Sequence, residues 1–179
     1  MVPIEVFVGI MVLLFTLIGF ARGFLRELGV TAMMVWTLFV LSLLGPLVER
    51  LTGSDALSAS QALWLCGGYL VILSVAALVS YHGETLAYGG VPPRGATGMV
   101  LGTMMGLVNG YLIAGSLWHY MARFAYPIRW LGFSAEQLSP AAMAMQPYLP
   151  PALLGQPILL GQSLLLYLSI LLIIARVIR

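Results

Sequence analysis

The chain has 179 residues, of which 61% are hydrophobic and only 8% are charged, and its formal net charge is +2 at pH 7. A soluble domain carries about a quarter charged residues, so the composition excludes an ordinary soluble protein and places most of the surface against lipid or other protein. The small net charge gives little basis for binding nucleic acid. The single cysteine, Cys66, excludes an intramolecular disulfide and a thiolate metal cluster.

Five apolar windows are long enough, or nearly so, to cross a bilayer, which takes roughly 17–25 residues. The charged residues, 8 basic and 6 acidic, lie outside these windows or at their ends. The sequence therefore predicts an all-α, polytopic transmembrane bundle of about five spans. We expect a retained first span and not a cleaved signal peptide, because no positive charge precedes it. The windows are residues 6–21, 28–48, 62–81, 96–118 and 158–175.

Two connections carry clear local signals. Ser58 followed by Gln61 is a capping box that predicts the start of the third span. Residues 82–95 hold several glycines and a Pro-Pro pair, which are typical of a turn and not of a domain.

The long connection, residues 119–157, predicts one or two short helices at the outer membrane interface. Its two helix-start signals are Ser134 with Gln137, and Ser139 followed by Pro140. Four aromatic residues are expected to anchor this segment at the interface: Trp118, Tyr120, Tyr126 and Trp130.

The arginines predict the orientation, because cytoplasmic connections carry the excess of positive charge. With the turn after the first window in the cytoplasm, the N-terminus lies outside and the C-terminus inside. The arginines then inside are Arg22, Arg26, Arg94, Arg176 and Arg179, and those outside are Arg50, Arg123 and Arg129.

A stripe of glycines runs along the fourth window. Glycines four residues apart let two helices approach closely in lipid, and no water competes there for the helix hydrogen bonds. The stripe therefore predicts a groove that another helix fills. An internal partner is favoured over a separate protein or a second copy, and the candidates are Gly19 with Gly23, or Gly67 or Gly68. The stripe consists of Gly98, Gly102, Gly106 and Gly110.

A carboxylate follows the first window at the same spacing. Gly19, Gly23 and Glu27 stand four apart, which predicts one face ending in a carboxylate near the inner boundary. A carboxylate there needs a partner, and the candidates are Arg22, Arg26 and Arg94. A structural ion pair is favoured, and a role in ion or substrate passage is the alternative.

Asn109 lies near the middle of the fourth window, beside the glycine stripe. A buried amide in lipid seeks a hydrogen-bond partner on another helix, and such bonds are worth about 0.6–2 kcal/mol. We expect Asn109 to join helices, with a conduction role as the alternative.

The sequence gives little support for catalysis or for a bound cofactor. His82 and His119 follow the third and fourth windows, roughly 34 Å apart at 1.5 Å per residue, so they cannot ligate one haem or metal. The sequence contains no nucleophile elbow, zinc-protease motif or phosphate-binding loop. We expect no catalytic residues, no bound cofactor or metal, and no enzymatic activity.

Two segments carry a resemblance to a known family. Residues 19–29, GFARGFLRELG, resemble the first signature of the colicin V production protein (CvpA-like) family, in which a short first span ends in a glycine, an arginine-glycine pair and a glutamate. Residues 101–115, LGTMMGLVNGYLIAG, resemble its glycine-rich fourth span. The chain differs at Gly98-Met99, where the family often has an acidic or amide residue and an arginine, and at Asn109, where it often has a basic residue. The matching residues are Gly19, Arg22, Gly23, Glu27, Leu101, Gly102, Gly106 and Gly110.

The resemblance implies a bacterial inner-membrane protein that assists toxin production, secretion or envelope assembly through helix packing. Residues 1–157 would form the four-span module, and residues 158–179 an additional C-terminal transmembrane helix. The expected partners are the lipid bilayer and, at the groove of the fourth span, a membrane protein or a second copy. Two alternatives remain: an accessory subunit of a larger membrane complex, or a small channel or transporter with Arg22, Glu27 and Asn109 along its path.

Overall fold

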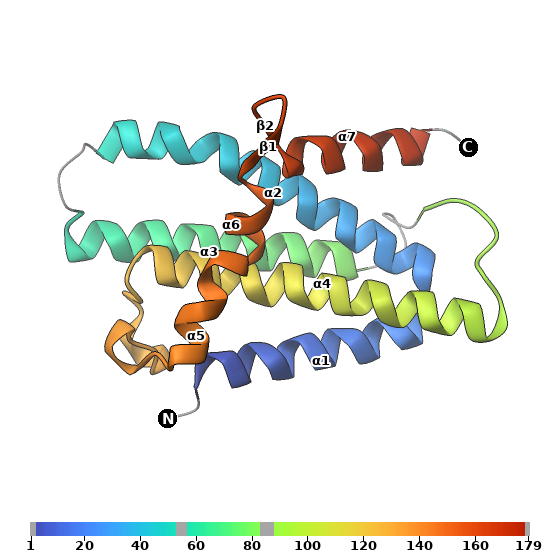
Figure 1. The fold of residues 1–179 in the computed structure, drawn as a ribbon, viewed down its shortest axis with the longest axis horizontal. Helices are drawn as coiled ribbons and strands as arrows, with labels where there is room; N and C mark the ends of the chain where they lie inside the picture. Colours follow the sequence, from blue (N-terminus) through green and yellow to red (C-terminus); the bar gives the residue numbers. More distant parts are fainter. Residues whose placement is uncertain (1–2, 53–56, 83–87, 178–179) are drawn as a thin grey trace.

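The computed structural model describes residues 3–52, 57–82 and 88–177, most of which are helical (Figure 1). Within these described residues, four helices are long and apolar enough to cross a bilayer, which confirms the all-α membrane bundle. Each covers the corresponding predicted window and extends beyond it. The four are α1 (Ile4–Arg22), α2 (Phe24–Thr52), α3 (Ala59–Tyr81) and α4 (Gly95–Arg123).

Helix α4 is the centre of the bundle, since it contacts α1, α2 and α3. The four helices alternate in direction along the long axis of the molecule (Figure 1). One cluster of buried apolar side chains joins α2, α3 and α4 and includes Met34, Leu73 and Ile113. A second cluster includes Val8 of α1 and Trp118 of α4. The interior is therefore built mainly around α4.

Helix α3 begins at the predicted capping box. The Ser58 hydroxyl accepts a hydrogen bond from the Gln61 backbone N–H at 3.3 Å, and the Gln61 side-chain oxygen accepts one from the Ser58 backbone N–H at 2.9 Å. This prediction is confirmed.

The segment after α4 forms more short helices than the one or two predicted. Ser139 accepts from the Ala142 backbone N–H at 3.0 Å, with Pro140 as the first helical residue, so this start signal is confirmed. Ser134 directly precedes a short helix, so this start signal is also confirmed, although the Ser134 side chain makes no capping hydrogen bond. The segments are η1 (Arg129–Leu131), η2 (Ala135–Gln137), α5 (Pro140–Met145), η3 (Gln146–Tyr148) and α6 (Pro150–Leu154).

These short helices pack along the side of the bundle. The Ser139 hydroxyl donates to Glu5 at 2.5 Å, which ties α5 to the start of α1. Further along, the Tyr111 hydroxyl donates to the backbone carbonyl of Tyr148. Tyr111 is twelve residues before the end of α4, or about 18 Å along a helix. The segment thus extends well along α4, which the predicted interfacial position did not anticipate.

Three of the four predicted aromatic anchors are buried, so their assignment as anchors is wrong. Trp118 is fully buried and donates from its indole nitrogen to the Tyr126 hydroxyl at 2.9 Å. Tyr120 stacks on Tyr69 with ring centroids 4.3 Å apart. Burial raises the pKa of the Tyr126 phenol, an effect that the bond from Trp118 partly opposes. Trp130 alone of the four is exposed, at 84%. Trp118 and Tyr126 pack with residues of the returning segment, whereas Tyr120 packs against α3.

The fifth window begins as a hairpin and only then becomes a helix. Strands β1 (Pro157–Leu159) and β2 (Gln162–Ser163) pair antiparallel, and α7 (Leu164–Val177) follows. The predicted start of this helix at residue 158 is therefore wrong. At 14 residues, α7 extends about 21 Å, less than the roughly 30 Å hydrocarbon core of a bilayer. It packs against α2.

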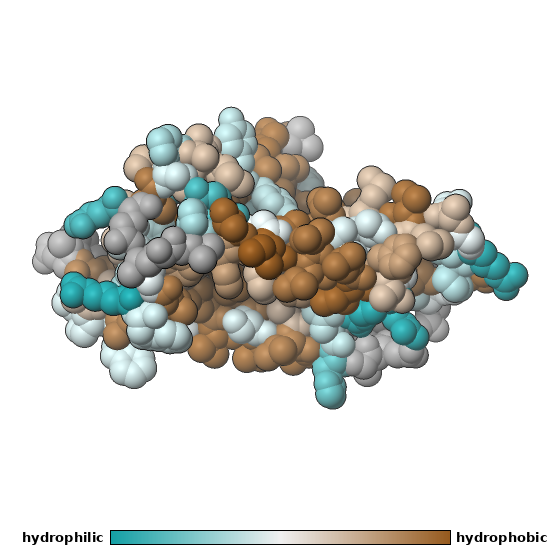
Figure 2. Space-filling model, turned by 90° about the horizontal axis from the view of Figure 1, so that it is seen from below, coloured by the Kyte–Doolittle hydropathy of each residue, from teal (hydrophilic) through white to brown (hydrophobic). Residues whose placement is uncertain are grey.

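The outer surface of the bundle is apolar. In the face seen from below, brown apolar side chains cover the middle and teal hydrophilic ones lie mainly toward the edges (Figure 2). Helix α1 exposes large apolar side chains, among them Leu13 and Leu17 at 59% and 58%. Such a surface fits contact with lipid.

Candidate functional site

The turn between α1 and α2 positions the first part of the site. Helix α1 ends at Arg22, and Gly23 has a φ of +84°, a left-handed conformation that favours glycine. Because the chain turns there, Glu27 lies in the first turn of α2 and does not continue the face of Gly19. The prediction of one shared face for Gly19, Gly23 and Glu27 is therefore wrong, yet the turn brings Arg22 and Glu27 together.

A glycine seam joins α1 to α4, and we define it as Gly19 on α1 with Gly102, Gly106 and Gly110 on α4. A Cβ atom on Gly106 would lie 2.5 Å from the Phe15 carbonyl oxygen and 2.8 Å from the Gly19 Cα. A Cβ on Gly102 would lie 2.7 Å from the Gly19 carbonyl oxygen. These neighbours are backbone atoms that cannot turn aside, so the two helices meet only because the side chains are absent.

The seam shows which partner fills the predicted groove. Helix α1 of the same chain lies in it, as favoured from the sequence. Gly98 does not take part in the contact with α1, because a Cβ there would meet the carbonyl group of Pro93. Gly67 and Gly68 have open space at the Cβ position within 4 Å, so they do not form the alternative partner surface.

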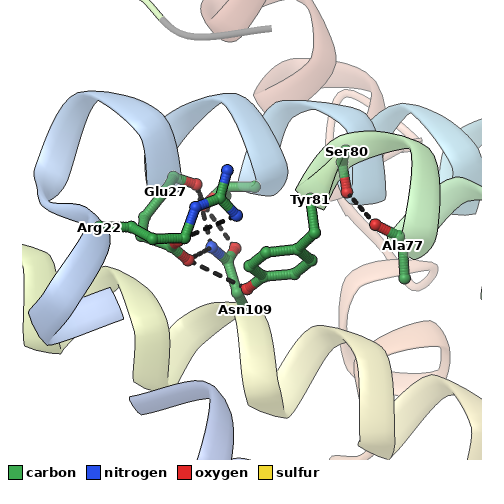
Figure 3. A network of polar contacts seen from close by, with 7 residues as sticks. Arg22, Glu27, Ala77, Ser80, Tyr81 and Asn109 are labelled. Atoms are coloured by element: carbon green, nitrogen blue, oxygen red, sulfur yellow. Dashed lines mark hydrogen bonds and ion pairs between the residues drawn. The ribbon is translucent and has the colours of Figure 1, made fainter. Parts of the chain in front are cut away.

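A buried polar cluster lies beside the seam and includes Arg22, Glu27, Tyr81 and Asn109 (Figure 3). Thr31 belongs to it through the hydrogen bond of its hydroxyl to Asn109. Glu27 is fully buried. Its Oε2 atom accepts from the Tyr81 hydroxyl at 3.0 Å and from the Asn109 amide nitrogen at 2.8 Å. Two helices distant in sequence thus donate to one carboxylate on α2.

Asn109 is fully buried, and both the nitrogen and the oxygen of its side-chain amide have hydrogen-bond partners. Its nitrogen also donates to the Glu27 backbone carbonyl at 2.9 Å, and its oxygen accepts from the Thr31 hydroxyl at 2.7 Å. The interhelical bonding predicted for Asn109 is present, and it joins α4 to α2.

Arg22 supplies the charge opposite Glu27. Its Nη1 atom lies 3.6 Å from the Glu27 Oε1 atom, and its guanidinium lies over the Tyr81 ring at 4.6 Å from the centroid. A carboxylate in an apolar interior needs such a partner to offset its desolvation. At 3.6 Å the pair is an ion pair without a hydrogen bond, and neither atom has a hydrogen-bond partner among the described residues.

The other predicted partners of Glu27 lie elsewhere. Arg26 and Arg94 are exposed, and Arg94 precedes the first residue of α4. Sequence reasoning missed Tyr81 and Thr31. Thr31 follows Glu27 by four residues and so shares its helical face, which is a signal that was available. Tyr81 ends an apolar span, and its position at the end gave no sign of which helix its hydroxyl would reach.

The arrangement is suited to holding helices together. Each of the four long helices contributes to the polar cluster, and α1 and α4 are also joined along the seam. Among the described residues, no group of three or more His, Cys, Asp or Glu side chains could hold a metal ion. The geometry thus defines a tightly packed helical membrane protein. Comparison with protein-family models, with curated proteins and with solved structures gives no match.

Proposed function

We propose that the protein is a non-enzymatic bacterial inner-membrane protein that assists toxin production, secretion or envelope assembly, as its resemblance to colicin V production proteins implies. One observation carries the proposal. The two segments of resemblance lie some eighty residues apart in the chain, yet their residues meet in one structural unit. Gly19 packs on Gly102 and Gly106 in the glycine seam, and Arg22 and Glu27 of the first segment form an ion pair in the adjacent polar cluster.

The polar cluster favours this proposal over conduction. A channel or transporter path through Asn109 needs water to reach its amide. Asn109 and Glu27 are fully buried, and the amide is bonded to Glu27 and Thr31. Buried hydrogen bonds of this kind between helices support a structural role for both residues.

The proposed orientation places the N-terminus outside and the C-terminus in the cytoplasm, because α7, although too short to span the bilayer, ends toward the end of the bundle that holds the α1–α2 turn (Figure 1). Its support is the charge of the α1–α2 turn and of the α3–α4 connection, which lie at one end of the bundle (Figure 1). These connections carry Arg22, Arg26 and Arg94. Arginine-rich connections remain on the cytoplasmic side during insertion.

A complementation assay tests the proposed function. The gene would be deleted in its host carrying a colicin V plasmid, and secreted toxin activity and sensitivity to detergents would be measured. We expect both to change on deletion and to be restored by the natural gene and by Gly9→Leu, but not by Gly106→Leu. Gly9 is the matched control because a Cβ there has nothing within 4 Å. Unchanged toxin activity and envelope resistance on deletion would refute the proposal.

An accessory-subunit role makes a separate prediction. Since α1 fills the groove of α4, a partner would have to use another face. Native mass spectrometry of the protein purified gently from membranes distinguishes the two. Companion subunits at a fixed ratio would favour the accessory role, and a lone chain or homo-oligomer would favour the proposed function.

A further inference from the structure

A cavity of about 700 Å³ lies at the end of the bundle where α1 turns into α2 and the chain enters α4. We call it the arginine cavity. The α1–α2 turn forms one wall, including Arg22 and Arg26, and residues of the segment before and at the start of α4, including Tyr88 and Met99, form the other. It is separate from the glycine seam and adjoins the polar cluster at Arg22.

Among the described residues that line the cavity, the charged side chains are both arginines. Arg22 and Arg26 line it, and the Arg176 guanidinium lies 5.7 Å from the centroid of the Tyr88 ring at its wall. The Glu27 Oε1 atom lies 3.6 Å from the Arg22 Nη1 atom and offsets part of its charge, but Glu27 is fully buried and is not among the residues that line the cavity. Guanidinium groups bind phosphate oxygens with paired N–H donors. The cavity therefore favours a phosphate group over a neutral or cationic one.

Two further features suit a phosphate. The first turn of α2 lies in the cavity wall, and the backbone N–H groups of a first helical turn have no partner within the helix and carry the positive end of its dipole. Phe20 and Met99 also line the cavity, and each is 49% exposed on the apolar surface. An occupant can thus place an anionic group beside the arginines and an apolar portion along α1 and α4.

We propose that the arginine cavity binds a phosphate group, supplied by the headgroup of an anionic phospholipid or by soluble phosphate. Basic pockets between helices at a membrane boundary are suited to such headgroups. The exposed apolar wall at Phe20 and Met99 favours the lipid as the source. This inference rests on the cavity and is independent of the proposed function.

Native mass spectrometry of the full chain in neutral detergent tests the proposal. Equal concentrations of phosphatidylglycerol and phosphatidylcholine are added, and the bound fraction of each is measured. We expect phosphatidylglycerol to bind more tightly. Arg26→Gln should weaken its binding about fivefold, the effect of one arginine near a membrane surface. Arg129→Gln is the matched control, because Arg129 is also exposed but lies in η1, away from the cavity.

Inorganic phosphate at millimolar concentration distinguishes the two sources. If phosphate displaces phosphatidylglycerol and chloride at equal ionic strength does not, the result would support the site and show that soluble phosphate can occupy it. If phosphatidylglycerol stays bound, the result would support the site and show that the lipid supplies the phosphate group. Equal binding of the two lipids, or equal losses in Arg26→Gln and Arg129→Gln, would overturn the proposal. Circular dichroism checks that both variants remain folded.

Discussion

The two faces of α4 hold the bundle together in opposite ways. Toward α1 it presents Gly102 and Gly106, and the contact depends on the absence of side chains. Toward α2 it presents Asn109, whose amide makes three hydrogen bonds with Glu27 and Thr31. The first contact is regular and apolar, and the second is irregular and polar.

The difference separates close packing from specific bonding. A glycine seam brings two backbones together, but its four-residue repeat offers similar contacts again after a shift of one repeat, about 6 Å along the helix axis. A buried hydrogen-bond network has one satisfied arrangement, and a shift leaves polar groups unpaired in lipid. We infer that the seam sets the distance between α1 and α4, and that the polar cluster sets how the helices align along their axes.

The largest expected effect comes from breaking the seam. In Gly106→Leu the new side chain meets the backbone of Phe15 and Gly19, and we expect the free energy of unfolding to fall by about 3 kcal/mol, the upper part of the usual range for overpacking. Chemical unfolding in detergent, followed by circular dichroism, measures it.

The matched control for the seam is Gly9→Leu, on the open side of α1. We expect a change within about 0.5 kcal/mol, as for a surface substitution. Equal losses in the two variants would show that leucine is harmful in these helices generally and that the seam is not special.

The next effect comes from removing the charge of the polar cluster. Glu27→Gln leaves Arg22 without its opposite charge, and we expect a loss of about 2 kcal/mol, below the 3–5 kcal/mol of a fully buried pair, because the Arg22 side chain is 19% exposed. Unfolding of Glu27→Gln, Arg22→Met and the double variant measures the coupling. A double variant that loses the full sum of the single losses would contradict the ion pair.

A smaller effect comes from removing one hydroxyl of the cluster. Tyr81→Phe deletes the donor to Glu27 and keeps the ring beneath Arg22, and we expect a loss of about 1 kcal/mol. Tyr148→Phe is the control, since that side chain is 67% exposed. If both variants unfold like the natural protein, the Tyr81 hydroxyl does not stabilise the cluster.

The smallest effect concerns α7. The Tyr88 hydroxyl donates to the Leu172 carbonyl at 2.7 Å, and Tyr88→Phe should raise hydrogen exchange in α7 a few-fold, with α1 to α4 unchanged. Burial raises the pKa of Tyr88, so the phenol stays protonated and this contact should persist at every pH below about 10. Unchanged exchange in α7 would show that other contacts hold this helix.

The sequence predicted the seam because its signal is local. Four-residue spacing identifies a helical face by itself, and Gly19 and Gly106 meet as expected. Gly98 shares the spacing and still faces Pro93, because the segment before α4 folds back on it. Spacing locates a face but does not show what covers it.

The polar cluster could be predicted only in part. Glu27 and Asn109 were each recognised as needing a partner, yet nothing in the sequence indicates that they bond to one another across 82 positions. The packing of the region after α4 was still harder to predict from the sequence. The buried positions of Trp118 and Tyr126 depend on how the short helices return along α4, and turn and cap signals do not specify that path.

The most direct test is a disulfide across the seam. A Cβ on Gly110 would lie 3.0 Å from the Cβ of Phe15 and 2.8 Å from the Cα of Val12, so the two helices must separate slightly to accept it, and this separation brings the two Cβ atoms toward the roughly 3.5–4.5 Å of a disulfide. Phe15→Cys with Gly110→Cys, in a Cys66→Ala background, would be oxidised in membranes and analysed by mass and by gel under non-reducing conditions. Leu14→Cys with Gly110→Cys is the control, since Leu14 is on the exposed side of α1. We expect a disulfide within one chain for the first pair and none for the control. Disulfide-linked dimers instead would show that α4 receives α1 from another copy, which contradicts the internal seam.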